Sequence, residues 1–590
     1  MGTGEVHRRR WTIRLSAVVV AVAAAGYGLA AARFGPALSG VAPAAATGSL
    51  PAGGPAVQPR SLTVSTDAGK VFGRTTGLVD QFLGIPYAAP PVGRLRWEPP
   101  RPVRPGAGIR SALSYGSRCP QLPSTNGPRF DTENCLAVNV YAPAVIPAGA
   151  KLPVLFMING GALENGAGDQ HDGSLLAQEA QIIVVSFNYR LGPFGFLTLP
   201  GLTAARSAVN GNFGLLDMEA ALSWVKRNIA AFGGDPGAVA IGGESAGAGA
   251  VCALLASPPA AGLFSRAILQ SGGCVSEPAA AAQQNSLFLA ARAGCTVPAK
   301  AAACLRSKPE ATLLNASAGY LPQFVSGGPE LPVSPAQAIA SGRFNKVPIL
   351  LGTNRDEARP LAAAAAFWTQ QQYVQFVTST FGAALAPAVL KAYPLSDFPQ
   401  PYAIAYALAA ELTDSGVIDG IGGCSEQNLA QRFVSDRTQT FFYEFDDRNA
   451  PPLSNNLPPR YQDGAGHATD LAYMWPSFTN GLSFYAELTG AQLRLSRQMI
   501  AYWGAFVRDG APAAAFQPPW RSYGSRLLMS LRPGDQSHEI LGAEFAVEHN
   551  CAFWNTIGKS AEGVPSMGAL TPRARHVGAR ARWLLTALGE

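Results

Sequence analysis

A single Gly-x-Ser-x-Gly sequence, Gly243–Gly247, is the feature that most constrains the fold of this chain. It follows a short apolar run, Ala238–Ile241, and precedes an Ala-rich stretch of helical character that ends near Pro258. Glycines beside a serine tolerate the strained backbone of a sharp strand-to-helix turn and let strand and helix approach closely. The pattern predicts that Ser245 is exposed as a nucleophile at the start of a helix. Because such a motif also arises by chance in a chain with 64 glycines, a base, an acid and an oxyanion hole must be found elsewhere.

Short, continuous apolar runs recur along the chain, as expected for strands buried on both faces of a parallel sheet. A stretch with apolar residues at helical spacing, Leu215–Ile229, separates two of them. This alternation predicts an α/β fold with a large, mostly parallel, doubly wound central sheet and helices on both faces. We find no central linker or repeat and expect one catalytic domain over residues 61–555. The runs are Leu152–Ile158, Ile182–Phe187, Ala267–Gln270, Val347–Leu351 and Phe441–Phe445.

The search for a base is short because the chain has only six histidines. Two of them lie in the terminal segments, which leaves four candidates. His467 is favoured because it follows the strand at Phe441–Phe445 in a small loop, Asp463–Thr469, although a surface histidine is the alternative. The terminal pair is His7 and His576, and the other candidates are His171, His538 and His549.

An orienting acid and an oxyanion hole are also predicted at the ends of buried strands. Asp356 and Glu357 follow the run at Val347–Leu351, which gives the chain order serine, acid, histidine that α/β-hydrolases share. Gly160 and Gly161 directly follow the run at Leu152–Ile158 and supply backbone N–H groups where side chains would obstruct an ester.

Charge argues against nucleic-acid binding. The formal net charge is +7, but residues 1–60 carry +5 and residues 556–590 carry +3, which leaves −1 for the body of the chain. A basic face for nucleic acid is therefore not supported. With 48% hydrophobic and 14% charged residues, the composition is that of a globular enzyme. No metal or cofactor is expected.

The N-terminal 60 residues predict export. A basic start is followed by an uncharged run from Leu15 to Ala32 and then by Ala/Pro/Gly-rich sequence. Cleavage after Ala32 or Ala46 is favoured, although an apolar run of this length can also remain as a membrane anchor. We therefore expect a secreted or cell-envelope protein with possible membrane association through this segment. The basic tail, 556–590, is expected to be a loosely ordered terminus rather than an amphipathic membrane helix.

Eight cysteines in an exported chain permit disulfides. Cys119 and Cys135 lie sixteen residues apart, and Cys295 and Cys304 lie nine apart, so both spacings can close small loops. Cys252 falls on the helix after Ser245, where we expect a buried free thiol. The sequence assigns no partner to Cys274, Cys424 or Cys551.

An ordered series of further segments resembles the type-B carboxylesterase family of α/β-hydrolases, which includes cholinesterases, fungal lipases and bacterial secreted esterases. The resemblance runs from about Ser61 to Trp554, and this chain looks most like the secreted bacterial branch. The segments are Phe82–Trp97, Glu133–Tyr141, Asn188–Phe196, Gly211–Asp217 and Asn228–Pro236.

This resemblance implies roles for particular residues. Ser245 would be the nucleophile, Glu357 rather than Asp356 the orienting acid, and His467 the general base. The backbone N–H groups of Gly161, Ala162 and Ala246 would form the oxyanion hole. It also implies two disulfides and two structural ion pairs, which are Cys119–Cys135, Cys295–Cys304, Arg96–Glu133 and Arg190–Asp217.

Some positions depart from the family pattern. Asn159-Gly160-Gly161-Ala162 stands where the family usually has His-Gly-Gly-Gly, and a methyl group at Ala162 is costly if the backbone there has a positive φ. We expect this to give a smaller acyl site or a lower rate. Outside this loop, Ala468 replaces a common Gly, Asp470 a usual Glu and Met218 a customary Gln.

Two functions of different classes follow. The leading one is a serine carboxylic-ester hydrolase that acts through an acyl-enzyme on small-molecule or lipid esters with apolar groups. The other is a catalytically weak or inactive binding or adhesion protein on the same fold. Four aromatic residues could line a substrate gorge, although ordinary core packing is the commoner role of such residues; they are Phe367, Trp368, Trp475 and Phe478.

Overall fold

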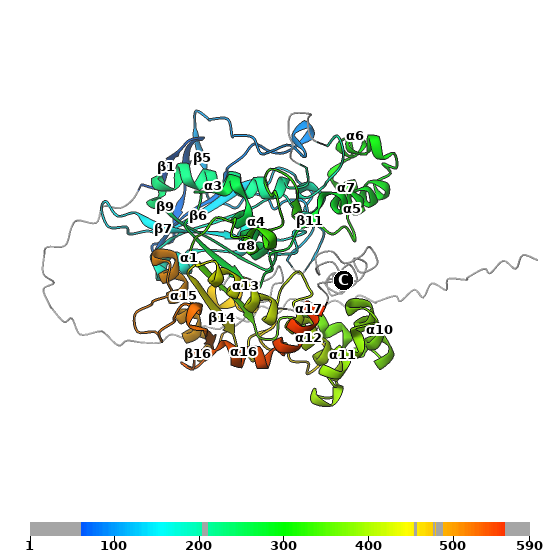
Figure 1. Ribbon diagram of the computed structural model, residues 1–590. Coiled ribbons are helices and arrows are strands. Elements are labelled where there is room, and N and C mark those ends of the chain that lie inside the picture. Colours follow the sequence, from blue (N-terminus) through cyan, green and yellow to red (C-terminus); the bar gives the residue numbers. More distant parts are fainter. Residues whose placement is uncertain are drawn as a thin grey trace, which may run out of the picture. The chain divides into compact units, whose positions relative to one another are not determined.

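The computed structural model describes residues 61–124, 126–202, 210–453, 457–475, 478 and 488–560 (Figure 1), which all belong to one compact unit. The predicted export segment, 1–60, and residues 561–590 of the predicted tail lie outside the described residues. The last described helix, α17, continues to Ser560, five residues beyond the domain boundary expected from the sequence. Among the described residues, no helix has the length and apolar character needed to cross a bilayer.

Eleven of the described strands form one sheet in the order β16-β15-β14-β13-β10-β9-β7-β8-β6-β4-β3. The strands from β8 to β15 pair in parallel, and the pairs at both edges are antiparallel. This confirms the large, mostly parallel sheet. The strands are β3 (Arg74–Thr75), β4 (Val79–Pro86), β6 (Ala137–Pro143), β7 (Leu152–Ile158), β8 (Ile183–Phe187), β9 (Gly234–Glu244), β10 (Arg266–Gln270), β13 (Ile349–Asn354), β14 (Thr440–Phe445), β15 (Leu527–Leu531) and β16 (His538–Leu541).

Helices cover both faces of this sheet (Figure 1). Alternate residues of β7 show the division: Phe156 belongs to the core shared with α3, α4 and α13, and Leu155 to the core shared with α1 and α15. Burial of each such side chain contributes about 1.5–3 kcal/mol, which explains why the run is apolar without alternation. These helices are α1 (Ser174–Ala180), α3 (Phe213–Asn228), α4 (Ala246–Ala256), α13 (Gly423–Ser435) and α15 (Gly490–Asp509).

Two further helical groups have apolar cores of their own. Helices α5 to α7 enclose one of them, and α9 to α12 with α17 enclose the other. Their bounds are α5 (Ala279–Arg292), α6 (Ala301–Arg306), α7 (Glu310–Ala316), α9 (Arg359–Ala362), α10 (Gln370–Phe381), α11 (Ala386–Ala392), α12 (Ala403–Ser415) and α17 (Cys551–Ser560). The remaining elements are β1 (Thr63–Thr66), β2 (Gly69–Phe72), β5 (Ile109–Ser111), β11 (Glu277–Pro278), β12 (Val325–Ser326), α2 (Gly192–Gly195), α8 (Pro335–Ala340), α14 (Leu471–Met474) and α16 (Gly542–Glu548), and short 3-10 turns.

All eight cysteines are disulfide-bonded, in the pairs Cys119–Cys135, Cys252–Cys274, Cys295–Cys304 and Cys424–Cys551. The expectation of a free thiol at Cys252 is therefore wrong. Strands β9 and β10 are parallel neighbours, so the segment that follows β10 returns beside α4. This brings the Cα atoms of Cys252 and Cys274 to 5.2 Å, within the range of a disulfide.

Candidate active site

Ser245 occupies the sharp turn between β9 and α4. Its backbone has φ 58° and ψ −125°, a conformation that is rare outside glycine and that is typically held by the surrounding structure at functional sites. A Cβ on Gly243 would lie 2.3 Å from the carbonyl oxygen of Gly247. A Cβ on Gly247 would lie 2.2 Å from the carbonyl oxygen of Ile158, at the end of β7. Both glycines of the motif are therefore required for the close packing of this turn.

The structure brings Ser245, His467 and Glu357 into one hydrogen-bonded chain. The Oγ of Ser245 lies 2.9 Å from Nε2 of His467, and Nδ1 of His467 lies 2.6 Å from Oε2 of Glu357. The three residues follow β9, β14 and β13 at their carboxyl ends, where open α/β sheets place their ligands. This arrangement has the geometry of a nucleophile, a base and an orienting acid.

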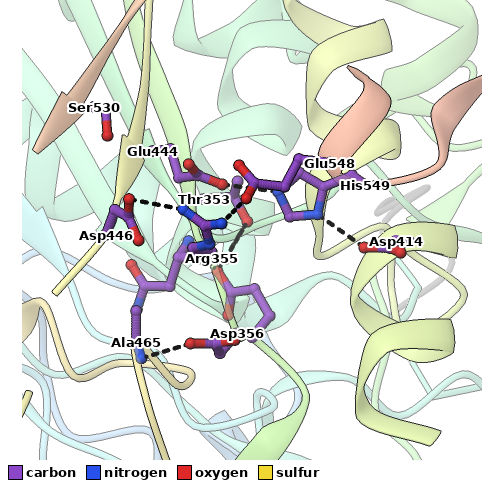
Figure 2. Close-up of polar contacts among 12 residues, drawn as sticks. Thr353, Arg355, Asp356, Asp414, Glu444, Asp446, Ala465, Ser530, Glu548 and His549 are labelled. Carbon is purple, nitrogen blue, oxygen red and sulfur yellow. Dashed lines mark hydrogen bonds and ion pairs between the residues drawn. The ribbon is translucent and has the colours of Figure 1, made fainter. Parts of the chain in front are cut away.

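Glu357 is held by a second set of hydrogen bonds. Its Oε1 accepts from the hydroxyl of Thr353 at 3.0 Å and from the backbone N–H of Asn354 at 2.7 Å, which leaves Oε2 directed to His467. Asp356 has different partners. It accepts from the N–H of Ala465 (Figure 2) and forms ion pairs with Arg359 and Arg448, so it braces the loop that carries His467.

A further carboxyl group, that of Glu244, faces His467. Its Oε1 lies 3.3 Å from Nε2 of His467. Burial raises the pKa of Glu244 to about 8, so this carboxyl is mostly protonated at neutral pH. Burial lowers the pKa of His467, but the charges of Glu244 and Glu357 raise it, with a net rise to about 9. The charge state of the imidazole therefore depends on the carboxyl groups around it.

The loop that follows β7 passes beside the serine. A Cβ on Gly160 would lie 3.1 Å from the Cβ of Ser245. Gly161 has φ 104° and Ala162 has φ 55°, and their N–H groups donate to no backbone carbonyl among the described residues. Ala162 therefore carries its methyl group on a backbone of positive φ, which is the conformation in which an alanine is less favourable than the usual glycine.

These residues line a cavity of about 850 Å³ with a mostly apolar wall. Ser245, His467, Gly161, Ala162 and Ala246 all face it. Of the four aromatic residues considered from the sequence, Phe478 lines the cavity. Trp475 is fully buried beside it, Phe367 is exposed, and Trp368 packs against Phe376 in the helical core around α10.

The other candidate histidines lie apart from the triad. His538 is exposed on the edge strand β16. His171 is buried in the wall of the cavity, which the sequence did not suggest. His549 follows α16 and bridges two carboxylates (Figure 2): its Nδ1 lies 2.8 Å from Asp414 and its Nε2 lies 2.7 Å from Glu444.

Buried ion pairs stabilise the surroundings of the site. Arg96 pairs with Glu133 at 2.5 Å, and Arg190 pairs with Asp217 at 2.7 Å, as the resemblance implied. Beside His549, Arg355 contacts Asp446 and Glu548 (Figure 2). These pairs join strands, helices and loops that are distant in the sequence. Within the described residues, no group of three or more His, Cys, Asp or Glu side chains is arranged to hold a metal ion.

Comparison with known proteins identifies the family. The model of the carboxylesterase family matches residues 60–554. This chain belongs to the carboxylesterase family. As a member, it is a carboxylic-ester hydrolase.

Relatives of this carboxylesterase come from bacteria and from mammals. The fumonisin B1 esterase of Sphingopyxis macrogoltabida is 33% identical over 79% of this chain and 85% of its own length. Carboxylesterase 5A of Felis catus is 33% identical over 84% of this chain and 94% of its own length. A solved structure of a PNB esterase superposes with a TM-score of 0.67 at 30% identity and covers 83% of this chain and 99% of that one. The α/β-hydrolase fold is therefore shared with known esterases.

Proposed function

We propose that this carboxylesterase is a serine hydrolase that acts through an acyl-enzyme. The observation that carries the proposal is the chain of two hydrogen bonds from Ser245 through His467 to Glu357, at the wall of a mostly apolar cavity. Ser245 Oγ attacks the ester carbonyl carbon while Nε2 of His467 takes its proton. His467 then protonates the departing alcohol, and water hydrolyses the acyl-enzyme by the same route.

The negative charge that develops on the carbonyl oxygen needs donors. The backbone N–H groups of Gly161, Ala162 and Ala246 are the proposed oxyanion hole, supported by the position of the glycine loop beside Ser245 and by the start of α4 directly after it. Removal of one such donor typically costs about 3–4 kcal/mol of transition-state stabilisation.

His467 must be neutral to accept the proton of Ser245. Because the pKa of Glu244 is raised by burial to about 8, its carboxyl holds a proton at neutral pH and the charge nearest to Nε2 is removed. Glu357 then remains as the carboxylate that orients the ring and stabilises the imidazolium when it forms.

The cavity supports uncharged, apolar esters as substrates. Its volume of about 850 Å³ is that of a site for a small organic molecule. Small-molecule esters and lipid esters with apolar acyl or alcohol groups both fit this description. Apolar residues from several parts of the fold line it, among them Leu163, Val275, Phe324, Leu412, Leu471 and Phe478.

The experiment that tests this function compares two serine variants. Ser245→Ala is expected to abolish hydrolysis of 4-nitrophenyl butanoate and labelling by an organophosphonate. Ser265→Ala is the matched control, because that serine contacts the backbone of Val239 in the middle of β9 and does not line the cavity. Turnover by the purified Ser245→Ala protein equal to that of the control would reject the mechanism. Absence of any phosphonate adduct on the folded wild-type chain would instead favour the binding protein.

We also propose that residues 1–60 direct export and that the catalytic domain begins near Ser61, as in secreted bacterial esterases. The segment serves as a cleaved signal or as an anchor, and the basic residues beyond 560 form a separate tail. Four disulfides among the described residues fit an oxidising compartment. N-terminal sequencing of protein from medium and membrane fractions tests this: a start within residues 33–61 is expected, whereas an intact Met1 in a soluble cytoplasmic fraction would reject export.

A further inference from the structure

His171 is a histidine in the wall of the catalytic cavity that the proposed mechanism does not use. It lies at the end of the 3-10 turn Gly168–Gln170, in the same connection between β7 and α1 that carries the glycine loop. The residue is 2% exposed. Its ring packs edge-on against Trp475, with ring centres 5.1 Å apart, and lies 5.6 Å from the ring of Phe478.

Neither ring nitrogen of His171 makes a hydrogen bond of normal geometry among the described residues, although the backbone of Ala167 lies near enough to the ring to raise its pKa against the larger effect of burial. Two polar residues of the same wall, Gln170 and Asn126, do have partners. Gln170 accepts from the N–H of Ala167 at 2.9 Å and donates to Asn126 at 3.2 Å, and the amide of Asn126 donates to Asn165. Burying a polar group without a hydrogen-bond partner is costly. A molecule bound in the cavity is therefore the available hydrogen-bond partner for His171.

The surroundings of His171 define what kind of group it can bind. Burial lowers its pKa to about 4, so the ring is neutral at neutral pH and offers one N–H donor and one nitrogen acceptor. The rings that contact His171, those of Trp475 and Phe478, are apolar on the faces they present, and they belong to the same apolar cluster as Leu453 and Leu471 of the cavity wall. A neutral ring in apolar surroundings suits an uncharged oxygen better than an ion, since an ion would lose its hydration here.

We propose that His171 is a specificity-determining residue that hydrogen-bonds an uncharged oxygen of the substrate, an ether, hydroxyl or ketone oxygen carried on the arm of the ester that lies against Phe478. This inference rests on the proposed ester hydrolysis. It narrows the substrate class from apolar esters in general to esters that carry one further neutral oxygen at a set distance from the scissile bond. Shape alone would not make this distinction, because an ether oxygen and a methylene group have nearly the same size.

The test compares esters that differ by one oxygen. In the acyl series, 4-nitrophenyl 3-methoxypropanoate is paired with 4-nitrophenyl pentanoate, and in the alcohol series, 2-methoxyethyl butanoate is paired with butyl butanoate. Each kcat/KM is divided by the rate of alkaline hydrolysis of the same ester, which removes intrinsic reactivity. In the series whose arm reaches His171, the variant His171→Phe is expected to lose about tenfold on the oxygen-containing ester, the value of one hydrogen bond, and less than twofold on its all-carbon partner.

Further variants separate recognition from packing. His171→Gln retains a donor and an acceptor and is expected to restore most of the preference, and His171→Leu replaces His171→Phe if the larger ring does not fold. Leu471→Met, in the same wall, is expected to change both esters of a pair by the same factor. The rate of organophosphonate labelling at Ser245 checks that each variant keeps an assembled triad.

The outcomes are distinct. Loss of the oxygen preference in one series, with restoration by His171→Gln, supports the inference. An equal effect of His171→Phe or His171→Leu on both members of both pairs overturns it while leaving the ester hydrolase intact. Absence of hydrolysis and labelling in the wild-type protein would instead reject the proposed function itself.

Discussion

Two histidines in this enzyme, His467 and His549, each use both ring nitrogens, yet their partners suit them to opposite tasks. His467 lies between a hydroxyl and a carboxylate, whereas His549 lies between two carboxylates. A ring that faces acceptors on both sides must be doubly protonated to satisfy them, so His549 is held as a cation. Since the hydroxyl of Ser245 can donate to Nε2, His467 can lose and regain a proton. A second carboxylate partner therefore keeps a histidine ring doubly protonated. A hydroxyl partner allows the ring to lose and regain a proton.

The exposure of the two rings agrees with these tasks. The side chain of His467 is 19% exposed and borders the cavity, while that of His549 is 3% exposed and closed in by α12, β14 and the α16–α17 turn. The cluster around His549 joins the C-terminal helices to the sheet. We therefore assign His467 to chemistry and His549 to stability, and the following variants test this division.

The largest expected effect comes from the acid beside each histidine. Glu357→Gln should lower kcat by about 10⁴-fold, because an amide no longer stabilises the imidazolium or the reactive tautomer of His467. Glu444→Gln makes the same chemical change at the other histidine and should lower kcat by less than about threefold. Steady-state kinetics with 4-nitrophenyl butanoate measures both. Equal losses of kcat in the two folded variants would remove the distinction between the two sites.

The next effect concerns stability. Burial alone would lower the pKa of His549, but its hydrogen bonds to Asp414 and Glu444 and their charges raise it to about 10. Because the folded pKa is above the unfolded value of about 6.5, this stabilisation is complete below pH 6.5 and is lost as the pH rises through about 10. His549→Gln should therefore lower the free energy of unfolding by about 3–5 kcal/mol at pH 6, and by much less at pH 10.

Urea unfolding of both proteins, with disulfides intact, measures this difference across the pH range. His538→Gln is the control, since that histidine is exposed on β16 and should change little at any pH. A difference between wild type and His549→Gln that does not shrink from pH 6 to pH 10 contradicts a histidine held as a cation.

A smaller effect is expected at Glu244. Its carboxyl group lies 3.3 Å from Nε2 of His467, is mostly protonated below about pH 8, and favours the imidazolium only when it ionises. In Glu244→Gln, the amide stays neutral at every pH, so the pH profile of kcat/KM should match that of the wild type below about pH 8 and depart from it only above that pH. Glu219→Gln, another buried carboxyl whose pKa is raised, is the control because it contacts Ser257 instead. A shift of the acid limb below pH 7 would show instead that Glu244 is ionised there and raises the pKa of the base.

The smallest effect is expected from Ala162→Gly. This change removes a methyl group from a backbone with φ 55° in the loop beside Ser245. The kcat/KM for esters with bulky acyl groups should rise by less than about tenfold, while that for acetate should stay nearly constant. A ladder of 4-nitrophenyl esters measures the ratio. A greater gain for acetate than for branched acyl groups would argue against a steric role for this methyl.

The sequence suggests the three residues of the proposed triad because each follows a buried strand that is readable as an apolar run. The choice of Glu357 over Asp356 was not accessible from position alone and came from the family resemblance. In the structure, Glu357 contacts His467 whereas Asp356 is engaged by Ala465, Arg359 and Arg448, which supports the proposed role of Glu357. Adjacent carboxylates cannot be told apart without their partners.

Other features depend on which elements become neighbours in space. The pairing of Cys252 with Cys274 follows from β9 and β10 lying side by side, and spacing along the chain does not reveal it. The sequence marks His171 only as one of four candidate bases, and its place in the cavity wall beside Trp475 and Phe478 becomes apparent only in the folded protein. Among the aromatic residues that could line a gorge, Phe478 lines the cavity, whereas Phe367 and Trp368 do not, and only the folded structure shows this difference.

Trapping of the acyl-enzyme tests the central account most directly. A slowly deacylating ester is mixed with the enzyme, the reaction is quenched in acid, and the peptide that contains residues 243–247 is examined by mass spectrometry. The account predicts one acyl group on Ser245, formed at least as fast as steady-state turnover and absent in Ser245→Ala. An acyl group on another residue, or turnover without any covalent acyl-enzyme on that time scale, would contradict it.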